Sequence, residues 1–330
     1  MRSEDEYYQR AIVRNFGPAE RVVKIETYRP PPLATDHVLV RMTHCAINPS
    51  DIITISGAYA HRTELPFVPG YEGVGVVEAT GGDSFLNVGD RVWPLGSAGA
   101  WQKFKVTDSR WCFRVPAGLS DEQAAFAYVN PLTALLLSRS LMSSPALHVA
   151  VNAAGSAIGR ILIKLANRVG IRPIAIVRNP RSLQLLSDLN LRGTLVEPGD
   201  RLSALIAEVT SGAGLDIVFD AVGGEEGARL ASGLRVNGVH LHYGLLSGTP
   251  LPVSLTTTRP DIDLRFFRLR DWVHFVERGE LAREMSAVAN LIQCGVAATP
   301  VEACYPLAKI GQALAHNARE GRQGKILVTC

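Results

Sequence analysis

The chain has 330 residues, of which 47% are hydrophobic and 20% charged, and its formal net charge at pH 7 is +3. These values are typical of a globular protein of about two domains, and they exclude an intrinsically disordered chain. Basic residues are spread along the whole sequence, so we expect no nucleic-acid partner.

The cysteines and the start of the sequence indicate in which cellular compartment the protein is found. The five cysteines are widely spaced and form no C-x-x-C pair, which predicts neither a disulfide framework nor a clustered structural zinc site. Residues 1–10 are polar and acidic and resemble neither a secretory signal nor a transit peptide. No segment is apolar for the roughly 18 residues that a membrane span needs. We therefore expect a cytoplasmic protein that does not contact membranes.

The first part of the chain predicts a β-rich module. Short β-branched segments punctuated by Gly and Pro are typical of an antiparallel, barrel-like fold, and we expect strands at 21–28, 37–47, 72–80 and 89–95. From Ser120 the pattern becomes helical. Ser120 is a suitable N-cap followed by two acids, and Pro131 is expected to kink the helix.

The middle of the chain predicts a parallel sheet. Strand patterns alternate with helix patterns, which indicates a doubly wound α/β domain. The expected strands are 147–153, 171–177, 194–197, 215–222 and 239–245, and the expected helices are 157–169, 182–189, 202–210 and 226–234. The remaining residues mix both patterns and end in a strand at 324–330, which we expect to return to the first module.

The turn between strand 147–153 and the next helix carries the strongest chemical signal. It reads A-x-x-S-x-x-G from Ala153 to Gly159, a departure from G-x-G-x-x-G. Small side chains let backbone N–H groups and the helix N-terminus approach a pyrophosphate. The turn therefore predicts a nucleotide-phosphate site, with a merely well-packed turn as the alternative. The expected contact residues are Gly155, Ser156, Ala157, Ile158 and Gly159.

The residues after the next strand indicate which nucleotide binds. A site that prefers NAD places an acid about 20 residues beyond the glycine-rich turn. Here Arg178 and Arg181 follow strand 171–177, and no acid occurs between Gly159 and Asp188. Guanidinium groups favour a ribose 2′-phosphate, so the predicted cofactor is NADPH. The alternative is that both arginines only solvate a helix start.

Over nearly its full length the chain resembles the medium-chain dehydrogenase/reductase superfamily. The motifs that carry the resemblance are the A-x-x-S-x-x-G turn, NPSD (48–51), PGYEGVG (69–75), VGDRV (88–92), LDIVFDAVGG (215–224) and GKILV (324–328). The resemblance implies an α/β protein with a GroES-like β-barrel catalytic domain (1–120), a Rossmann cofactor domain with a doubly wound parallel sheet (121–262) and a C-terminal return to the catalytic domain (263–330). It also implies a homodimer.

The positions that bind zinc in zinc-dependent members of the superfamily are changed here. Those members have two cysteines, or a cysteine and an acid, with a histidine. This chain has Asn48, Tyr71 and Asn130. Amides and a phenol are poor zinc ligands, so we expect no metal.

Within the zinc-independent branches, the chain is most similar to the mitochondrial-type 2-enoyl thioester reductases, and it also resembles quinone oxidoreductases. The matching segments are NPSD followed by Gly57-Ala58-Tyr59 and Glu64-Leu65-Pro66, Ala100-Trp101, VNPLTA (129–134), LHYGLLSG (241–248) and DLRFFRLRDW (263–272). The resemblance implies that Tyr59 is catalytic and that Asn48 and Trp101 contact the substrate. It also implies a set of further cofactor contacts, namely Asn130, Thr133, Tyr243, Gly244, Leu245 and Lys325. The chain departs from the family pattern at Ala60, His61 and Tyr71.

The implied reaction is the NADPH-dependent reduction of the C=C bond of acyl-CoA or acyl-carrier-protein substrates. Hydride would go to Cβ, and Tyr59 could supply the proton for Cα or a hydrogen bond. The alternatives are an NADPH:quinone or enone reductase, and an NADPH-binding protein without turnover.

Several residues have a second interpretation. Tyr59 could be an exposed loop aromatic, Trp101 a packing residue and Asn48 a loop-capping amide. His240 and His242 alternate on one strand and so face the same side, where they could pack or form a metal pair. The basic residues Arg265, Arg268 and Arg270 could meet the phosphates of coenzyme A or a carrier protein, or form a solvated face.

Overall fold

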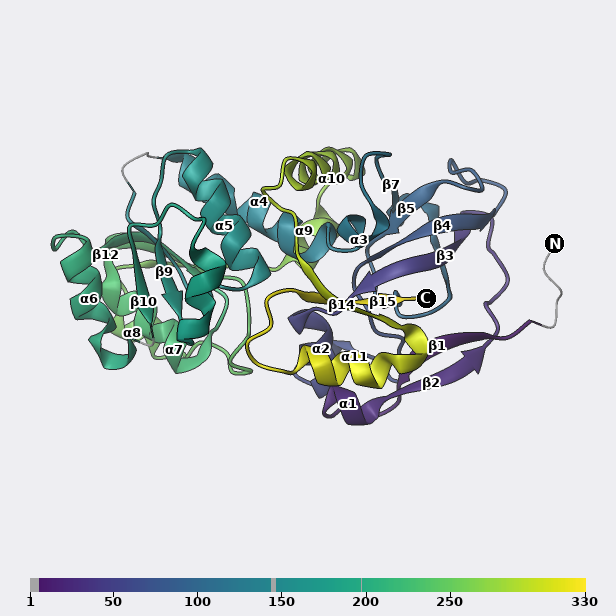
Figure 1. Cartoon of the computed structure of the whole chain (residues 1–330), viewed down its shortest axis with the longest axis horizontal. Coiled ribbons are helices and arrows are strands. Elements are labelled where there is room, and N and C mark those ends of the chain that lie inside the picture. Colours follow the sequence, from purple (N-terminus) through teal and green to yellow (C-terminus); the bar gives the residue numbers. More distant parts are fainter. Residues whose placement is uncertain (1–5, 144–146, 197) are drawn as a thin grey trace. The chain divides into compact units, whose positions relative to one another are not determined.

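The computed structural model describes residues 6–143, 147–196 and 198–330 (Figure 1). Residues 1–5, the first half of the polar start of the sequence, and the last residue of the strand expected at 194–197 lie outside these ranges. The chain divides into two compact units, one comprising Met1–Leu132 and Arg270–Cys330 and the other Thr133–Leu269. We call them the barrel unit and the sheet unit. Their limits lie after the boundaries at 120 and 262 that the sequence analysis placed.

The barrel unit is built on a seven-stranded sheet in the order β14-β15-β3-β4-β5-β7, with β6 also paired to β3. All pairs are antiparallel except β14 with β15. This is the expected GroES-like module. The strands are β3 (His37–Ala46), β4 (Gly73–Thr80), β5 (Arg91–Pro94), β6 (Phe104–Asp108), β7 (Cys112–Arg114), β14 (Val301–Pro306) and β15 (Lys325–Thr329).

The end of the chain returns to this sheet, as expected. β15 pairs with β3 in an antiparallel register that places Val328 opposite Cys45. A second, two-stranded sheet completes the β structure described in this unit. Its strands and the helices of the unit are β1 (Tyr8–Val13), β2 (Val23–Tyr28), α1 (Ala19–Val22), α2 (Pro49–Ser56), η1 (Ala60–Arg62), η2 (Ser109–Trp111), α3 (Asp121–Ala124), η3 (Tyr128–Leu132), α10 (Arg278–Gln293), η8 (Leu307–Lys309) and α11 (Ile310–Asn317). Helix α9 (Leu269–Phe275) begins at the boundary between the units.

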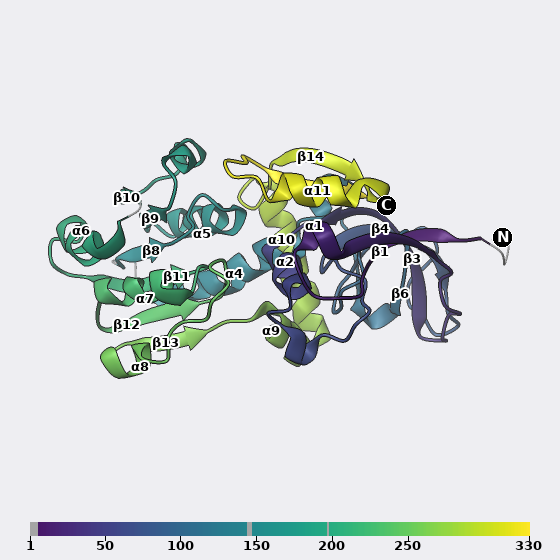
Figure 2. The same ribbon diagram turned by 90° about the horizontal axis from the view of Figure 1, so that it is seen from below.

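The sheet unit contains six parallel strands in the order β10-β9-β8-β11-β12-β13, which Figure 2 shows side by side. This order confirms the doubly wound α/β fold, because the chain moves outward from β8 in one direction and then from β11 in the other. The strands are β8 (Val149–Val151), β9 (Ile174–Val177), β10 (Gly193–Val196), β11 (Leu215–Asp220), β12 (Leu234–His242) and β13 (Asp263–Phe266). The helices are α4 (Thr133–Ser138), η4 (Arg139–Ser143), α5 (Ala157–Arg168), η5 (Pro180–Leu186), η6 (Gly199–Arg201), α6 (Leu202–Val209), α7 (Gly224–Arg229), η7 (Leu230–Gly233) and α8 (Leu255–Thr258).

One helical segment differs from the expectation, and another is interrupted where the sequence predicted a kink. The segment at 182–189 is not an α-helix but the short 3₁₀ helix η5, and within η5 only Leu186 is buried, so no apolar stripe holds a longer helix against the sheet. The helix after Ser120 begins as expected, because the Ser120 hydroxyl accepts a hydrogen bond from Gln123 N. It is broken at η3, a π-helical turn that contains Pro131, since proline offers no N–H to the helix.

Each unit has its own hydrophobic core. In the barrel unit β3, β15 and α11 pack apolar side chains around the fully buried Trp101. In the sheet unit β8, β9 and β11 pack against α6 and η7. Among the helices of the described residues, none combines the length and the apolar character that crossing a membrane requires.

Candidate active site

The predicted phosphate turn joins β8 to α5 in the sheet unit. Ser156 is the N-cap of α5, and its hydroxyl accepts a hydrogen bond from Gly159 N at 3.1 Å. A Cβ atom on Gly159 would lie 2.7 Å from Ala153 O, so only glycine allows the helix to start this close to the strand. Ala153 has φ +45°, which bends the chain sharply after the strand. The helix N-terminus is therefore aimed along the carboxyl edge of the sheet, where nucleotide phosphates bind in this fold class.

The arginine-bearing segment lies beside this turn. A Cβ atom on Gly155 would lie 2.9 Å from Ser182 Cβ, so the start of η5 packs against the turn. Arg178 and Arg181 are exposed on either side of Asn179, which caps η5 by accepting a hydrogen bond from Arg181 N at 2.9 Å. The small-residue turn and the two guanidinium groups thus belong to one region of the sheet unit. These residues fit a nucleotide that carries a 2′-phosphate.

A buried carboxylate, Asp220, joins the ends of three strands at the same edge. It accepts hydrogen bonds from Asn152 Nδ2 at the end of β8 (2.6 Å) and from His242 Nδ1 on β12 (2.7 Å). His240 Nε2 lies 3.3 Å from the same carboxylate. Asp220 and His240 are fully buried, and they are held by hydrogen bonds rather than by packing alone. This arrangement answers the question left open about His240 and His242: they bind a carboxylate.

The Asp220 carboxylate is kept ionised by its neighbours. Burial raises the pKa of Asp220, but the hydrogen bonds and the charges of the two histidines outweigh this effect and hold the pKa well below its usual range. Backbone N–H groups of Val222 and Gly223 also donate to it. The result is a rigid junction between β8 and β11, the two strands from which the chain winds in opposite directions.

The segment after β12 carries three of the predicted cofactor residues. Tyr243 N donates to Asp220 O at 2.9 Å, and the buried Tyr243 hydroxyl has no partner among the described residues. Burial raises the pKa of this phenol above its usual range. A Cβ atom on Gly244 would lie 2.5 Å from Ala221 O, so this turn also depends on glycine. Leu245 and Ile158 are half-buried, and Thr133 is buried in α4.

The barrel unit contains a second polar centre, which we call the Glu72 cluster: Asn48, Asp51, Glu72, Asn130 and Lys325. All five side chains are buried. The Asn48 amide is its centre: Nδ2 donates to Glu72 at 2.6 Å, and Oδ1 accepts from Lys325 Nζ at 2.6 Å and from Asn130 Nδ2 at 3.3 Å. The segment before β4, strand β15, the start of α2 and η3 therefore meet at the Asn48 amide.

The two carboxyl groups of the cluster accept hydrogen bonds from backbone N–H groups on either side of it. Glu72 accepts hydrogen bonds from Tyr128 N and Val129 N, at 3.1 and 2.6 Å, which fixes the start of η3. Asp51 accepts from Asn48 N at 2.8 Å and from Tyr71 N at 3.0 Å. The Tyr71 hydroxyl lies 3.0 Å from Thr54 Oγ1.

Burial shifts the pKa of each ionisable member of the cluster toward its neutral form. It raises the pKa of Asp51 to about 7 against opposing backbone hydrogen bonds, and it raises the pKa of Glu72 above its ordinary range. It lowers the pKa of Lys325 to about 8, although both carboxylates favour the ammonium form. One ammonium group thus serves two carboxyl groups, and burial raises the pKa of both.

Two of the predicted substrate contacts are buried. Trp101 is fully buried and its indole N–H donates to Ala46 O at 2.9 Å, so it packs in the core, the alternative kept for it above. Asn48 is also fully buried, and its amide is bonded to Glu72 and Lys325, so it organises the cluster.

Tyr59 lies where α2 ends, between the left-handed Gly57 and the 3₁₀ helix η1. Its ring is half-buried, and the Arg62 guanidinium carbon lies 4.0 Å from the ring centre. A cation over an aromatic face stabilises the ring in one orientation. The basic residues Arg265, Arg268 and Arg270 are exposed, and Arg265 forms an ion pair with Asp263.

Two important residues of these sites, Glu72 and Asp220, were not among the predicted ones. Each is an acid at one end of an otherwise apolar strand pattern: Glu72 precedes the strand in GYEGVGVV, and Asp220 ends the strand in LDIVFDAV. Acids are almost never fully buried unless they are paired, so an acid in such a pattern is a signal for a buried polar network.

Family models match both parts of the chain. Residues 34–117 match the alcohol dehydrogenase GroES-like domain, and residues 196–328 match the zinc-binding dehydrogenase family. The mitochondrial enoyl-[acyl-carrier-protein] reductase of Arabidopsis thaliana is 31% identical over 79% of this chain and 72% of its own length. The chain belongs to the medium-chain dehydrogenase/reductase superfamily. It is an oxidoreductase of that superfamily.

Solved structures of other members of this superfamily are similar over the whole length. A crystal structure from Bacillus thuringiensis, provisionally assigned as an NADPH:quinone reductase, is 33% identical, with a TM-score of 0.91, covering 99% of this chain and all of that one. A mycobacterial protein solved in complex with NADPH is 25% identical, with a TM-score of 0.85, over 98% of this chain and all of that one. The name of the plant relative places it in mitochondria, so the cytoplasmic expectation stays a prediction.

The zinc ion that the second family model implies does not fit the residues of this superfamily member. At the three ligand positions Asn48 is bonded to an ammonium group and a carboxylate, Asn130 donates to Asn48, and the Tyr71 hydroxyl is paired with Thr54. Zinc needs thiolate, imidazole or carboxylate donors with lone pairs turned toward the metal. In the described part of the chain, no group of three His, Cys, Asp or Glu side chains could hold a metal ion.

Proposed function

We propose that the protein is an NADPH-dependent reductase of the carbon–carbon double bond of 2-enoyl thioesters. The observation that carries the proposal is the Glu72 cluster, which offers amides, carboxylates and an ammonium group where zinc-dependent relatives bind a metal. Reduction of a simple carbonyl is helped by a Lewis acid, whereas conjugate reduction of an enoyl thioester needs only hydrogen bonds to the developing enolate. The named similarity to an enoyl-[acyl-carrier-protein] reductase agrees with this chemistry.

The sheet unit is the proposed NADPH site. We assign the pyrophosphate to the turn at Gly155, Ser156 and Ala157, and the 2′-phosphate to Arg178 and Arg181. When bound, NADPH supplies a hydride for Cβ of the substrate. The loop after β12, with Tyr243, Gly244 and Leu245, is held by Asp220 and is the proposed contact for the nicotinamide end. Asn130, Thr133 and Lys325 remain proposed cofactor contacts.

Tyr59 is the proposed proton donor to Cα. Its phenol follows the left-handed turn at Gly57, so the ring is presented by a short loop, and the Arg62 guanidinium restricts its orientation. The proposed carriers are coenzyme A or an acyl-carrier protein, and the proposed assembly is a homodimer.

A second candidate function is NADPH:quinone reduction. It is favoured by one specific observation, the 33% identity over the full length to the structure assigned as a quinone reductase. Quinones are reduced without a protein proton donor aimed at a Cα atom, so this activity would not need Tyr59.

The experiment compares the wild type with Tyr59→Phe, using NADPH with crotonyl-CoA or a small quinone. We expect kcat for crotonyl-CoA to fall about 100-fold or more in the variant, the range for loss of a general acid. Tyr7→Phe is the matched control, because Tyr7 is an exposed tyrosine of the same unit. Quinone turnover alone, unchanged in Tyr59→Phe, would replace the proposal by the second candidate. NADPH binding without reduction of either acceptor would overturn both.

A further inference from the structure

Two thiols meet in the barrel unit at a place that the proposed reaction does not use. The sulfur atoms of Cys45 and Cys330 lie 3.6 Å apart. The register explains the contact: Cys45 on β3 is opposite Val328 on β15, and Cys330 follows Val328 by two residues. Side chains two residues apart on a strand share a face, so both thiols point to the same side of the sheet. Cys45 Sγ also donates to Ala100 O at 2.9 Å.

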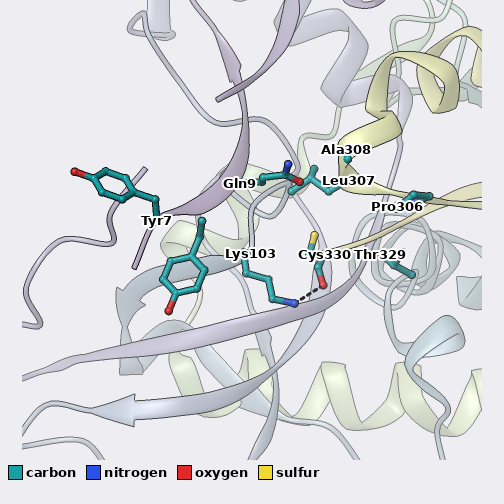
Figure 3. A pocket seen from close by; sticks show the side chains of 9 residues that line it. Tyr7, Gln9, Lys103, Pro306, Leu307, Ala308, Thr329 and Cys330 are labelled. Carbon is teal, nitrogen blue, oxygen red and sulfur yellow. Dashed lines mark hydrogen bonds between the residues drawn. The ribbon is translucent and has the colours of Figure 1, made fainter. Parts of the chain in front are cut away.

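A pocket gives one of these thiols access to small molecules. Its volume is about 350 Å³, and Figure 3 shows the Cys330 sulfur within it, with Lys103 on one side and Leu307 on the other. The remaining lining residues are Tyr7, Tyr8, Gln9, Pro306, Ala308 and Thr329. Lys103 Nζ donates to Cys330 O at 2.8 Å, so a cation is bound to the same residue as the thiol.

The two thiols are unequal. Cys330 is half-buried and lines the pocket, whereas Cys45 has no exposed surface. Burial raises the pKa of the Cys45 thiol well above its usual range, and the neighbouring Cys330 thiol raises it further. A reagent entering the pocket therefore meets Cys330 first, and Cys45 lies behind it. An accessible thiol with a second thiol in contact is the arrangement of redox-sensitive cysteine pairs.

The other three cysteines lack this arrangement. Cys112 is buried, and burial raises the pKa of its thiol to about 12. Cys294 and Cys304 are exposed on different elements, at the end of α10 and on β14. They therefore serve as internal controls for reagents that attack exposed thiols without selectivity.

We propose that Cys330 and Cys45 form a peroxide-sensitive dithiol whose accessible member, Cys330, is attacked through the pocket. The Cys330 thiol takes one oxygen from a hydroperoxide and becomes a sulfenic acid, while the other peroxide oxygen leaves as water or an alcohol. The Cys45 thiol then displaces water from the sulfenic acid, and the disulfide forms. Two thiols are thus oxidised by two electrons, and one peroxide bond is reduced.

The disulfide would act on the Glu72 cluster through β3. Ala46 and Ile47 follow Cys45 directly, and their carbonyl groups accept hydrogen bonds from Trp101 and from Lys325. A covalent S–S bond is about 2.05 Å long, so the two sulfur atoms, now 3.6 Å apart, must approach each other when the disulfide forms. We therefore expect oxidation to alter the position of Lys325 and Asn48.

The test uses the full-length protein with stoichiometric hydrogen peroxide, followed by alkylation of the remaining thiols and peptide mapping without reduction. We expect a Cys45–Cys330 disulfide peptide that disappears on treatment with dithiothreitol. Cys45→Ala should accumulate a sulfenic acid at Cys330, trapped by dimedone, and Cys330→Ala should leave Cys45 as a free thiol. Cys294→Ala is the matched control and should still form the disulfide.

The wild-type map decides the proposal even if a variant does not fold. Oxidation of Cys294 and Cys304 while Cys45 and Cys330 stay reduced would refute it. So would a disulfide that joins either of the pair to another cysteine. Sulfenic acid on Cys330 that never converts to the disulfide in the wild type would disprove the resolving role of Cys45.

Discussion

Asp51 and Glu72 are carboxyl groups with about 1% of their surface exposed. Both accept hydrogen bonds from Asn48, Glu72 from its side-chain amide and Asp51 from its backbone N–H. Buried carboxyl groups cost free energy unless they are hydrogen-bonded or paired. Here the cost is offset by backbone N–H groups at both ends of the cluster. The same hydrogen bonds hold the start of α2, the segment that leads to Tyr59. At the scale of single residues, the two carboxyl groups hold the backbone on both sides of the cluster in position.

The raised pKa of Asp51 predicts a pH-dependent stability. Its pKa is about 7 in the fold, against an ordinary value of 3.8 for an aspartate. Between about pH 4 and 7 the folded state therefore binds more protons than the unfolded state, and the free energy of unfolding falls as the pH rises through this window. In Asp51→Asn we expect this fall to become smaller. Urea unfolding followed by tryptophan fluorescence at pH 5 and pH 7 measures it, because all four tryptophans belong to the barrel unit.

Asp83→Asn is the control for this experiment. Asp83 is exposed on the loop after β4, so its removal should leave the pH dependence as in the wild type. An equal pH dependence in Asp51→Asn and in the wild type would show that Asp51 is ionised across the window.

At the scale of elements, the join between β8 and α5 is the most constrained part of the sheet unit. Ser156 caps the helix, Ala153 adopts a positive φ, and Gly159 leaves no room for a side chain against the Ala153 carbonyl. A bulkier residue would push the helix N-terminus away from the strand. Since the N–H groups of this helix start are the proposed phosphate ligands, packing and binding depend on the same contact.

Gly159→Ala is therefore expected to weaken NADPH binding at least tenfold and to destabilise the sheet unit by about 1–3 kcal/mol, the usual cost of overpacking. NADPH titration and circular-dichroism melting measure the two effects. Gly311→Ala is the matched control: Gly311 also lies in a helix, α11, but a Cβ atom there would meet nothing within 4 Å. The control should be neutral or slightly stabilising, because alanine is the better helix former. If the two variants bound NADPH and melted alike, the close contact between position 159 and the Ala153 carbonyl would be contradicted.

At the scale of the whole molecule, the proposed chemistry is divided between two units with separate cores. The sheet unit carries the small-residue turn and the arginines, and the barrel unit carries Tyr59 and the Glu72 cluster. A ligand that binds only the folded form of one unit stabilises that unit by about 2.7 kcal/mol at 100 times its dissociation constant.

NADPH should consequently slow amide hydrogen exchange most strongly in the sheet unit, around residues 152–160 and 178–182. NADH at the same concentration should protect the second segment less, because it lacks the 2′-phosphate that the arginines favour. Exchange measured by mass spectrometry tests this. In Arg181→Ala the advantage of NADPH should shrink, whereas Arg192→Ala, which removes another exposed arginine of the unit, should not change it. Equal protection by both nucleotides in the wild type would contradict the assigned role of the arginines.

The order and type of most elements could be predicted from the sequence, because they depend on local patterns. Alternating strand and helix segments indicate a parallel sheet. Small side chains after β8 allow a phosphate to approach the backbone closely. Arg178 and Arg181 could be placed beside that turn for the same reason, since they follow the neighbouring strand. The prediction of an α-helix at 182–189 was wrong. A short helix is stabilised mainly by packing an apolar face against the rest of the protein, and in η5 only Leu186 is buried.

By itself, the sequence determined the two kinds of sheet, the cofactor turn and the absence of suitable zinc ligands at three positions. Only the tertiary structure decided that Asn48 and Trp101 are buried, that Asp220 receives two histidines, and that Cys45 meets Cys330. The physical reason is that these contacts join residues on strands far apart in the sequence. They depend on which strands pair and in what register, and periodicity along one segment carries no information about either.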